Sequence, residues 1–573
     1  MEDSAIRAGF ENLREGADYD SLYEAALCRA KADWLVGING TRLFTTLYRG
    51  KTLNIGRVVT PTLALLAERE AEIAGFQKEK YHMVELDCGS FRAAGRRFKS
   101  KTDAEKLRKS CLGKQVEVLA AERQEKTEKA PKLYDLTTLQ REANRAYGYT
   151  AQQTLDYLQS LYEKKLATYP RTDSRYLTED MGERLAGLCR TVAGAFPFGG
   201  AFSGEVAAAQ VIDSSKVSDH HAILPTKEVS GNSMESLPTG ERKILAMVAA
   251  RLLCAVSTCK FVYEDTEVKL RCMGEDFFVK GRREVSEGWK KVERAFQKSV
   301  KAETETEGGR EKEDAPLPEL SEGQSLAVEG AAVKSGTTSP KKSYTEDALL
   351  SAMENAGAED FKEAGEMERK GIGTPATRAG IIEKLVKGGF AERRGRQLVP
   401  TSQGMELIRV LPDTIKSAKL TAEWETALRK VERGECSPGK FMEEIAGMVR
   451  DMVEDCRKTG AQTAEALSAP AKEVIGKCPR CGKPVYEGKK GFYCSGYQDA
   501  PPCGFALWKE SLYFKSKRKE LTKAVAAALL KDGRVKMKGL YSEKKGILYD
   551  GTIVMEDTGG RYVNFKLEFE GKN

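Results

Sequence analysis

Residues 167–177 read ATYPRTDSRYL and place a tyrosine and an arginine on either side of a proline. Pro170 fixes its own φ and disfavours a helical conformation at Tyr169, so we expect a turn that presents a phenol and a guanidinium together. A phenol has a pKa of about 10, so it attacks an ester only if its proton is removed or its oxyanion is stabilised. Arg171 suits the electrostatic part, because it is permanently charged and binds phosphate through two N–H groups. By itself, this pattern more often marks a buried tyrosine beside a surface arginine.

Length and composition predict a soluble protein of several domains. The chain has 573 residues, of which 40% are hydrophobic and 31% charged, and single cores seldom grow beyond about 250–300 residues. A formal charge of +8 is small for this length, so a polyanionic partner would have to meet local basic patches. The sequence has no run of about 18 apolar residues and no signal-peptide pattern at its start, which favours a cytoplasmic protein that does not contact a membrane.

Four further stretches accompany the central one in a fixed order. They are RAKADWLVGINGTR at 29–42, NIGRVVTPTL at 54–63, SDHHAILPT at 218–226 and GIGTPATR at 371–378. Together with TYPRTDSR at 168–175, they resemble the motifs of type IA DNA topoisomerases, most closely those of the bacterial topoisomerase III branch. The resemblance covers residues 1 to about 435.

The resemblance implies a fold and an activity. The fold is a multidomain α+β, toroidal core, in which helical DNA-binding and gate domains join a β-rich connecting domain. The activity is ATP-independent breakage of single-stranded DNA, strand passage and rejoining, which relaxes negative supercoils or decatenates DNA. In the family the central tyrosine keeps the 5′ phosphate, so the expected catalytic residues are Tyr169, Arg171 and His220, with His220 contacting the phosphate. Without the resemblance, His220 and His221 would be read as a structural pair.

The resemblance also implies a groove that receives single-stranded DNA. Gly56 would let the backbone approach the strand, and a helix that begins at Thr374 would offer its amides to a phosphate. Val59 departs from the family pattern, in which glutamine is common at that position, and this leaves a polar contact there in doubt. The expected DNA-binding residues are Asp33, Arg42, Arg57, Thr60, Thr374 and Arg378.

Capping signals, apolar periodicity and the family pattern divide the chain into eight segments. Thr137 with Gln140 and Thr150 with Gln153 are capping-box patterns that should open two helices, and Gly148 should end the first. The expected segments are a helical DNA-groove domain at 1–60 and 341–460, the latter winged-helix-like, a β-rich connecting domain at 61–122 and 226–298, a gate domain at 123–225, a flexible segment at 299–340, centred on 303–314, a zinc-ribbon-like module at 470–510 and a small α+β module at 511–573.

The last four of the 13 cysteines have the spacing of a metal site, whereas the other nine look like ordinary reduced cysteines. The spacing C-x2-C-x12-C-x8-C is typical of a zinc ribbon, in which paired cysteines supply thiolates to a tetrahedral Zn²⁺. The second pair is looser than usual, so a metal-free ribbon is the alternative. The expected ligands are Cys478, Cys481, Cys494 and Cys503.

Two patterns of the family are not found in this sequence. One is an early Glu-Lys-Pro-Ser stretch and the other an Asp-x-Asp-x-Glu cluster that binds Mg²⁺, and both belong to the Toprim domain with which family members begin. We therefore expect Mg²⁺ and the acid for the leaving oxygen to come from a Toprim domain outside this chain, such as a separate polypeptide. No phosphate-binding loop for ATP is present either. A monomer near the nucleoid is expected, and a DNA-binding remnant without catalysis is the alternative.

Overall fold

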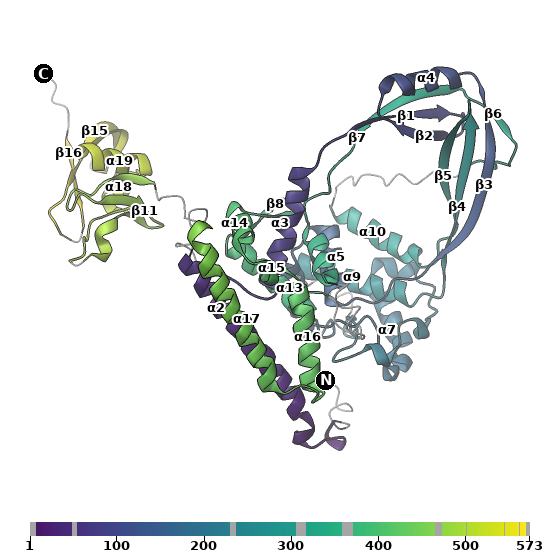
Figure 1. Cartoon of the computed structure of the whole chain (residues 1–573), viewed down its shortest axis with the longest axis horizontal. Helices are drawn as coiled ribbons and strands as arrows, with labels where there is room; N and C mark the ends of the chain where they lie inside the picture. The colour runs from purple at the N-terminus through teal and green to yellow at the C-terminus, as the bar shows by residue number, and fades with distance from the viewer. Residues whose placement is uncertain are drawn as a thin grey trace. The chain divides into compact units, whose positions relative to one another are not determined.

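The computed structural model describes residues 7, 9–47, 54–229, 236–304, 317–357, 371–463, 473–499, 501–543, 545–560 and 562–568. The chain divides into two compact units, one formed by Met1–Phe44 with Thr52–Gly460 and the other by Thr45–Lys51 with Ala461–Asn573 (Figure 1). Within the described ranges, no helix combines the length and the apolar character that crossing a membrane requires.

The larger unit contains a seven-stranded antiparallel sheet in the order β6-β3-β4-β5-β2-β1-β7. Its strands are β1 (Lys80–Asp87), β2 (Arg92–Phe98), β3 (Gln115–Glu128), β4 (Phe261–Cys272), β5 (Glu275–Ser286), β6 (Ser325–Ala327) and β7 (Gly330–Thr337). Helix α4 (Lys101–Cys111) packs on β1 and β7 (Figure 1). The strands expected before residue 122 are present, and β4 and β5 return to the same sheet from residues 261–286.

Both edge strands lie in the segment 299–340, which the sequence predicts to be flexible. β7 reads GAAVKSGT, and its small and polar side chains give no alternation of apolar and polar residues. Pairing with β1 along its whole length, from Thr337 opposite Lys80 to Gly330 opposite Asp87, provides the order that the sequence pattern does not reveal. The most flexible part was expected at 303–314, which lies outside the described residues except for the end of helix α10 (Lys290–Thr304).

The segment around Tyr169 rests on a helical core that runs from Leu133 to Val292. Its helices are α5 (Leu136–Tyr147), α6 (Ala151–Glu163), α7 (Gly182–Ala195), α9 (Thr239–Ala255) and the start of α10. α6 begins with the predicted capping box of Thr150 and Gln153, and the predicted Gly148 ends α5 with a φ of 72°. The start predicted for α5 is wrong: its N-cap is Asp135, which lies two residues before Thr137.

Helix α9 belongs to this core, although residues 226–298 were expected to form part of the connecting domain. Apolar residues such as Ile244, Val248 and Leu252 are buried, and so are most of their neighbours in the helix. A helix that is apolar nearly all round gives no 3.6-residue period, so the sequence pattern did not distinguish it from strands.

The larger unit also contains a small hairpin, β8 (Ala391–Arg394) and β9 (Gln397–Pro400), which contacts helices α3, α13 and α14. Helix α13 has the predicted start, with Thr374 as its N-cap and Pro375 in its first turn; Gly388 is its C-cap, and the hairpin follows it. Figure 1 shows α2 alongside α17, and the thiol of Cys28 donates to the Pro438 carbonyl at 3.8 Å. The remaining described α-helices of the larger unit are α2 (Asp20–Leu47), α3 (Val59–Gly75), α11 (Glu346–Asn355), α13 (Pro375–Lys387), α14 (Ser402–Val410), α15 (Asp413–Lys416), α16 (Lys419–Glu432) and α17 (Pro438–Thr463).

The smaller unit has one hydrophobic core, which includes residues from both modules expected at 470–510 and 511–573. Gly476 lies so close to helix α19 that a Cβ there would come within 2.6 Å of Leu530. The strands form one four-stranded and one three-stranded antiparallel sheet. The elements are β10 (Val474–Lys477), β11 (Pro484–Glu487), β12 (Gly491–Cys494), β13 (Ala506–Trp508), α18 (Leu512–Ser516), α19 (Lys523–Asp532), β14 (Arg534–Ser542), β15 (Ile547–Glu556) and β16 (Asn564–Glu568).

Candidate active site

The Tyr169 ring lies between two other rings. One is the His220 imidazole, whose centroid lies 4.2 Å from that of the Tyr169 ring at an interplanar angle of 38°. The second neighbour, Tyr162 near the end of α6, packs edge-on at 5.5 Å and 85°. Edge-on and tilted arrangements at these distances are favourable for aromatic rings and limit how the tyrosine turns. Tyr169 is half-buried and His220 is exposed, so solvent reaches the site.

Backbone and side-chain hydrogen bonds hold the Tyr169 segment against the 218–226 stretch. The Thr168 amide donates to the Leu224 carbonyl at 2.9 Å, and the Ala222 amide donates to the Tyr176 carbonyl at 2.9 Å. The Thr172 hydroxyl donates to the carbonyl of His220 at 2.8 Å. These bonds join the 167–177 and 218–226 stretches, so the fold brings together two motifs that lie about fifty residues apart.

Two arginines of the segment have different environments. Arg171 is exposed, and its guanidinium contacts no carboxylate or other acceptor within the described ranges. Arg175 instead donates to the Asp135 carboxylate, with an Nε–Oδ2 distance of 2.5 Å. Asp135 is buried and also caps α5, accepting from the Thr138 amide at 2.6 Å. Arg171 is therefore available to a ligand, and Arg175 ties the segment to the start of α5.

His221 has a different environment from its neighbour His220, because it is half-buried whereas His220 is exposed. Its Nδ1 lies 2.7 Å from the Ala222 carbonyl, which fixes the ring beside the backbone. Burial lowers the pKa of this imidazole, and the nearby His220 lowers it further, against the opposing effect of the carbonyl. The neutral ring is therefore favoured in the folded protein.

At the start of α13, where a phosphate-binding site was expected, the side chain of Arg378 is buried. It donates from Nη1 to the Thr137 hydroxyl at 3.0 Å and from Nε to the Ile372 carbonyl at 3.2 Å. Burial lowers the pKa of this guanidinium. Thr374 caps the helix together with Thr377, whose hydroxyl accepts from the Thr374 amide at 2.9 Å. Arg378 thus joins α13 to α5 in this structure.

Arg57 is also held by protein groups. It contacts Asp33 through two bonds of 2.9 and 3.2 Å and Glu425 through one of 3.1 Å. Its guanidinium lies 5.2 Å from the Trp424 ring centroid, and the residue is only 8% exposed. This network joins α2 to α16. The Arg57 guanidinium, which was expected to contact a DNA phosphate, is instead paired with two carboxylates of the protein.

The other two residues expected in the groove differ in exposure. Thr60 is buried, and its hydroxyl accepts from the Gly56 amide at 3.2 Å, which closes the first turn of α3. Arg42 on α2 is exposed and has no ion pair among the described residues. Of the six residues expected to bind DNA, Arg42 therefore presents the most accessible cation.

The arginines of the β8–β9 hairpin are occupied as well. Arg393 pairs with Glu346 and Glu383, and Arg394 pairs with Glu392. Arg396 donates to the Arg145 carbonyl at 3.1 Å. Arg393 and Arg396 therefore join the hairpin to neighbouring elements, whereas Arg394 pairs within the hairpin.

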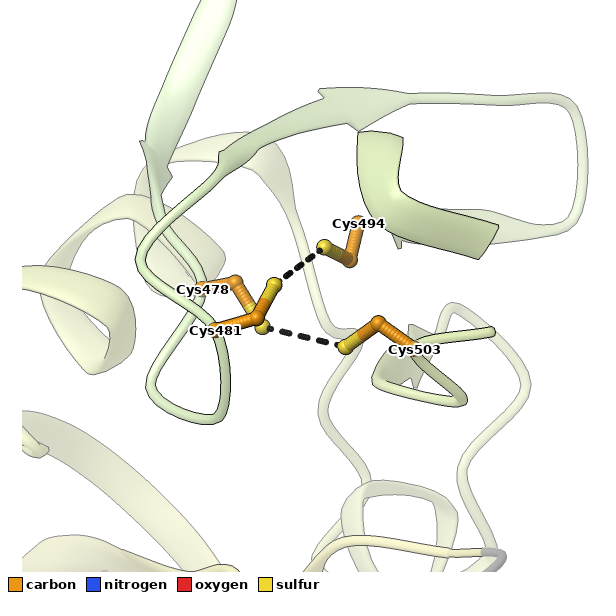
Figure 2. Close-up of side chains that lie close together, drawn as sticks. All are labelled: Cys478, Cys481, Cys494 and Cys503. Atoms are coloured by element: carbon orange, nitrogen blue, oxygen red, sulfur yellow. Dashed lines mark hydrogen bonds between the residues drawn. The ribbon is translucent and has the colours of Figure 1, made fainter. Parts of the chain in front are cut away.

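The four C-terminal cysteines come together at the ends of the ribbon strands. Their sulfur atoms all lie within 4.8 Å of one another, and Figure 2 shows Cys481 directed at Cys494 and Cys478 at Cys503. The two sulfur–sulfur distances are 3.3 and 3.7 Å. Backbone donation from Lys483 lowers the pKa of Cys481 to about 7, which favours a thiolate. Four converging sulfurs of this kind can bind a tetrahedral Zn²⁺.

This cluster is the only group of three or more close metal-ligating side chains within the described part of the chain. No carboxylate cluster that would suit Mg²⁺ accompanies it there. The described residues around Tyr169 therefore supply aromatic, cationic and backbone groups.

Comparison with known proteins agrees with the arrangement of these motifs. Residues 17–443 match the family described as DNA topoisomerase. The chain belongs to the type IA DNA topoisomerase family. It is 38% identical to DNA topoisomerase 3 of Bacillus subtilis over 510 residues, which cover 85% of this chain and 68% of the relative. It is 36% identical to DNA topoisomerase 3 of Bacillus licheniformis over 516 residues, with the same coverage of 85% and 68%.

A solved structure supports the fold of this topoisomerase. Full-length topoisomerase I from Thermotoga maritima superimposes with a TM-score of 0.58 at 24% identity, over 86% of this chain and 78% of that one. The mixed helical and β-sheet architecture predicted from the sequence is thus confirmed.

The sequence did not single out three residues of the site. Tyr162 lies seven residues before Tyr169, outside the TYPRTDSR stretch, although its ring packs against the Tyr169 ring. Asp135 and Thr137 offer competing N-cap signals two residues apart, and the aspartate, just before apolar Leu136, is the one that caps α5. Glu241, which binds the end of α6, lies 77 residues from its partner Lys164, and no local pattern marks it.

Proposed function

We propose that this type IA topoisomerase breaks single-stranded DNA with the phenol of Tyr169. The phenol oxygen attacks a backbone phosphorus, the bond from phosphorus to the 3′ oxygen breaks, and the phenol gives up its proton while the 3′ oxygen gains one. The DNA end then carries a 5′-phosphotyrosyl ester. Because this ester conserves the energy of the broken bond, the reverse reaction rejoins the strand without ATP. Strand passage between the two steps relaxes negative supercoils or decatenates DNA.

The observation that carries this proposal is the placement of Tyr169 between Tyr162 and His220, beside exposed Arg171, which has no acceptor within the described ranges. A nucleophile held in one orientation avoids much of the entropic cost of reaching a phosphorus atom. Arg171 stabilises the charge that develops on the phosphate, and exposed His220 donates to a phosphate oxygen. His221, held on the Ala222 carbonyl, positions the backbone that carries His220.

DNA contacts in this proposal divide between exposed and buried residues. Arg42 contacts the DNA backbone directly, whereas Asp33 and Arg57 fix the shape of the groove through their ion pair. Thr60, Thr374 and Arg378 likewise stabilise the helix starts that line the groove.

The proposal also includes two metal ions and a nucleic-acid partner. Zn²⁺ would be held by Cys478, Cys481, Cys494 and Cys503 and would cross-link the ribbon strands. Mg²⁺ neutralises charge during rejoining when it is bound, and we assign its site and the acid for the 3′ oxygen to a Toprim domain, on the same or on a separate polypeptide. The protein works as a monomer on single-stranded DNA in the cytoplasm, at the nucleoid.

A covalent-trapping experiment tests the proposal. The chain is incubated with Mg²⁺ and a 3′-labelled single-stranded oligonucleotide, with and without a purified Toprim domain, and adducts that resist denaturation are counted. We expect an adduct that disappears in Tyr169→Phe. An adduct that forms only with added Toprim supports the assignment of the acid to that domain, and one that the chain forms alone contradicts that assignment. No adduct under either condition would contradict catalysis and leave a protein that only binds DNA.

A further inference from the structure

Only three non-glycine residues in the described ranges have a positive φ: Lys165 at 63°, Met273 at 52° and Arg518 at 53°. This conformation costs an ordinary L-residue free energy, because its Cβ approaches the neighbouring carbonyl. Lys165 lies where α6 ends, and its amide donates to the Tyr162 carbonyl at 2.9 Å while the Leu166 amide donates to the Leu161 carbonyl at 2.9 Å. Glycine is the usual residue at such a helix end. The lysine is therefore kept at a conformational cost.

The two adjacent lysines at this corner differ in what their charges do. Lys164 pairs with Glu241, which is buried and also accepts from the Ser160 hydroxyl at 2.9 Å. Lys165 is exposed, and its ammonium contacts no acceptor within the described part of the chain. Lys164 thus anchors the end of α6, whereas the charge of Lys165 has no structural task.

The corner is joined directly to the catalytic segment. The Thr226 hydroxyl donates to the Lys165 carbonyl at 2.5 Å, and the Thr226 amide donates to the Leu166 carbonyl at 3.0 Å. Tyr162, whose carbonyl accepts from Lys165, packs its ring against Tyr169. Lys165 therefore sits on the same framework as the phenol, four residues before it, as Arg171 does two residues after it.

We propose that Lys165 is a phosphate-binding residue that contacts the single-stranded DNA backbone next to the Tyr169 phenol. Its ligand is a phosphodiester oxygen, held by an ammonium ion. Glycine would relieve the backbone but lacks a charge, and this explains a lysine in the left-handed conformation. The inference rests on the proposed function, because it places the DNA strand at Tyr169.

Binding is measured in the Tyr169→Phe background, so that cleavage plays no part. Fluorescence anisotropy follows a labelled single-stranded oligonucleotide at salt concentrations from about 50 to 200 mM. We expect Lys165→Gly to weaken binding by about three- to tenfold and to lower the slope of log K against log salt by about 0.7, the value for one phosphate on a single strand. Lys165→Arg should keep both the affinity and the slope.

Although Lys165→Gly should weaken DNA binding, it should make the folded protein more stable to heat. Lys165→Gly should raise the midpoint of thermal unfolding by about 1–3 °C, because glycine tolerates a positive φ. Met273→Gly, at the exposed turn between β4 and β5, is the matched control, which should raise the midpoint without changing the affinity. Unchanged affinity and slope in Lys165→Gly would overturn the inference and leave Lys165 as a helix end only. Because the binding assay needs no covalent adduct, a negative result for Lys165 can be distinguished from a failure of Tyr169 to cleave DNA.

Discussion

The ion pair between Arg175 and Asp135 should control how firmly the catalytic segment is held. Among the described residues, the Asp135 carboxylate accepts hydrogen bonds from the Thr138 amide at 2.6 Å and from Arg175 Nε at 2.5 Å. The side chains are 6% and 34% exposed for Asp135 and Arg175, respectively. Arg175→Met keeps the aliphatic part of the side chain but leaves a buried carboxylate with its helix cap only.

The magnitude follows from burial. Removing one partner of a fully buried pair costs about 3–5 kcal/mol, and a hydrogen bond to a charged group is worth about 1.5–3 kcal/mol. Since Arg175 is one-third exposed and the cap remains, we expect Arg175→Met to lower the free energy of unfolding by about 2 kcal/mol. Asp135→Asn keeps a good N-cap and should cost about 1 kcal/mol, and Asp135→Ala should cost about 1 kcal/mol more.

The double variant gives the sharpest test. Adding Asp135→Asn to Arg175→Met removes the uncompensated buried charge and should recover about 1 kcal/mol of the loss. Urea unfolding of the full chain measures these differences, and hydrogen exchange at residues 167–177 and at the start of α5 localises them. If the second substitution added to the loss instead of reducing it, the charge of Asp135 would not be the source of the cost.

Three further predictions concern separate parts of the molecule. Because the pKa of His221 is lowered on folding, the unfolded state binds more protons, so stability should fall as the pH drops below about 6.5, the unperturbed value; His221→Leu should flatten this dependence in urea titrations. Purified chain should contain one zinc per molecule by elemental analysis, and Cys494→Ser should lose the metal and the protection of residues 473–508 against proteolysis, whereas Cys436→Ser should change neither. Arg57→Met should destabilise the chain by about 2 kcal/mol, because half-exposed Asp33 loses its partner and Glu425 keeps only Arg29. Exposed Arg42→Met should change stability by no more than about 0.5 kcal/mol and should instead weaken DNA binding; equal stability losses in both variants would contradict this division.

Local signals in the sequence predicted local structure well. The capping box at Thr150, the glycine that ends α5 and the start of α13 at Thr374 are each specified by residues within a few positions of one another. The cysteine site is instead specified by a spacing that runs from Cys478 to Cys503. The helix starts and ends were predictable because the interactions that fix them lie within one turn of the chain.

Long-range contacts could not be predicted from these signals. Arg57 and Arg378 stand in motifs that suggest phosphate binding, yet their partners Glu425 and Thr137 lie 368 and 241 residues away. Nothing near either arginine in the sequence indicates that it meets a protein group instead of solvent. The edge strand β7 and the buried helix α9 were not predicted for a related reason. Their conformation is determined by the elements that they pack against, and their own residues show no strand or helix periodicity.

Identification of the residue that holds the DNA tests the central claim most directly. Trapped adducts, formed with added Toprim domain where needed, are digested with nuclease and trypsin. Cleavage after Lys165 and Arg171 releases the peptide LATYPR, whose only tyrosine is Tyr169. We predict that mass spectrometry finds this peptide with a 5′-nucleotide phosphate on the phenol. A nucleotide on any other peptide would contradict the assignment of Tyr169 as the nucleophile.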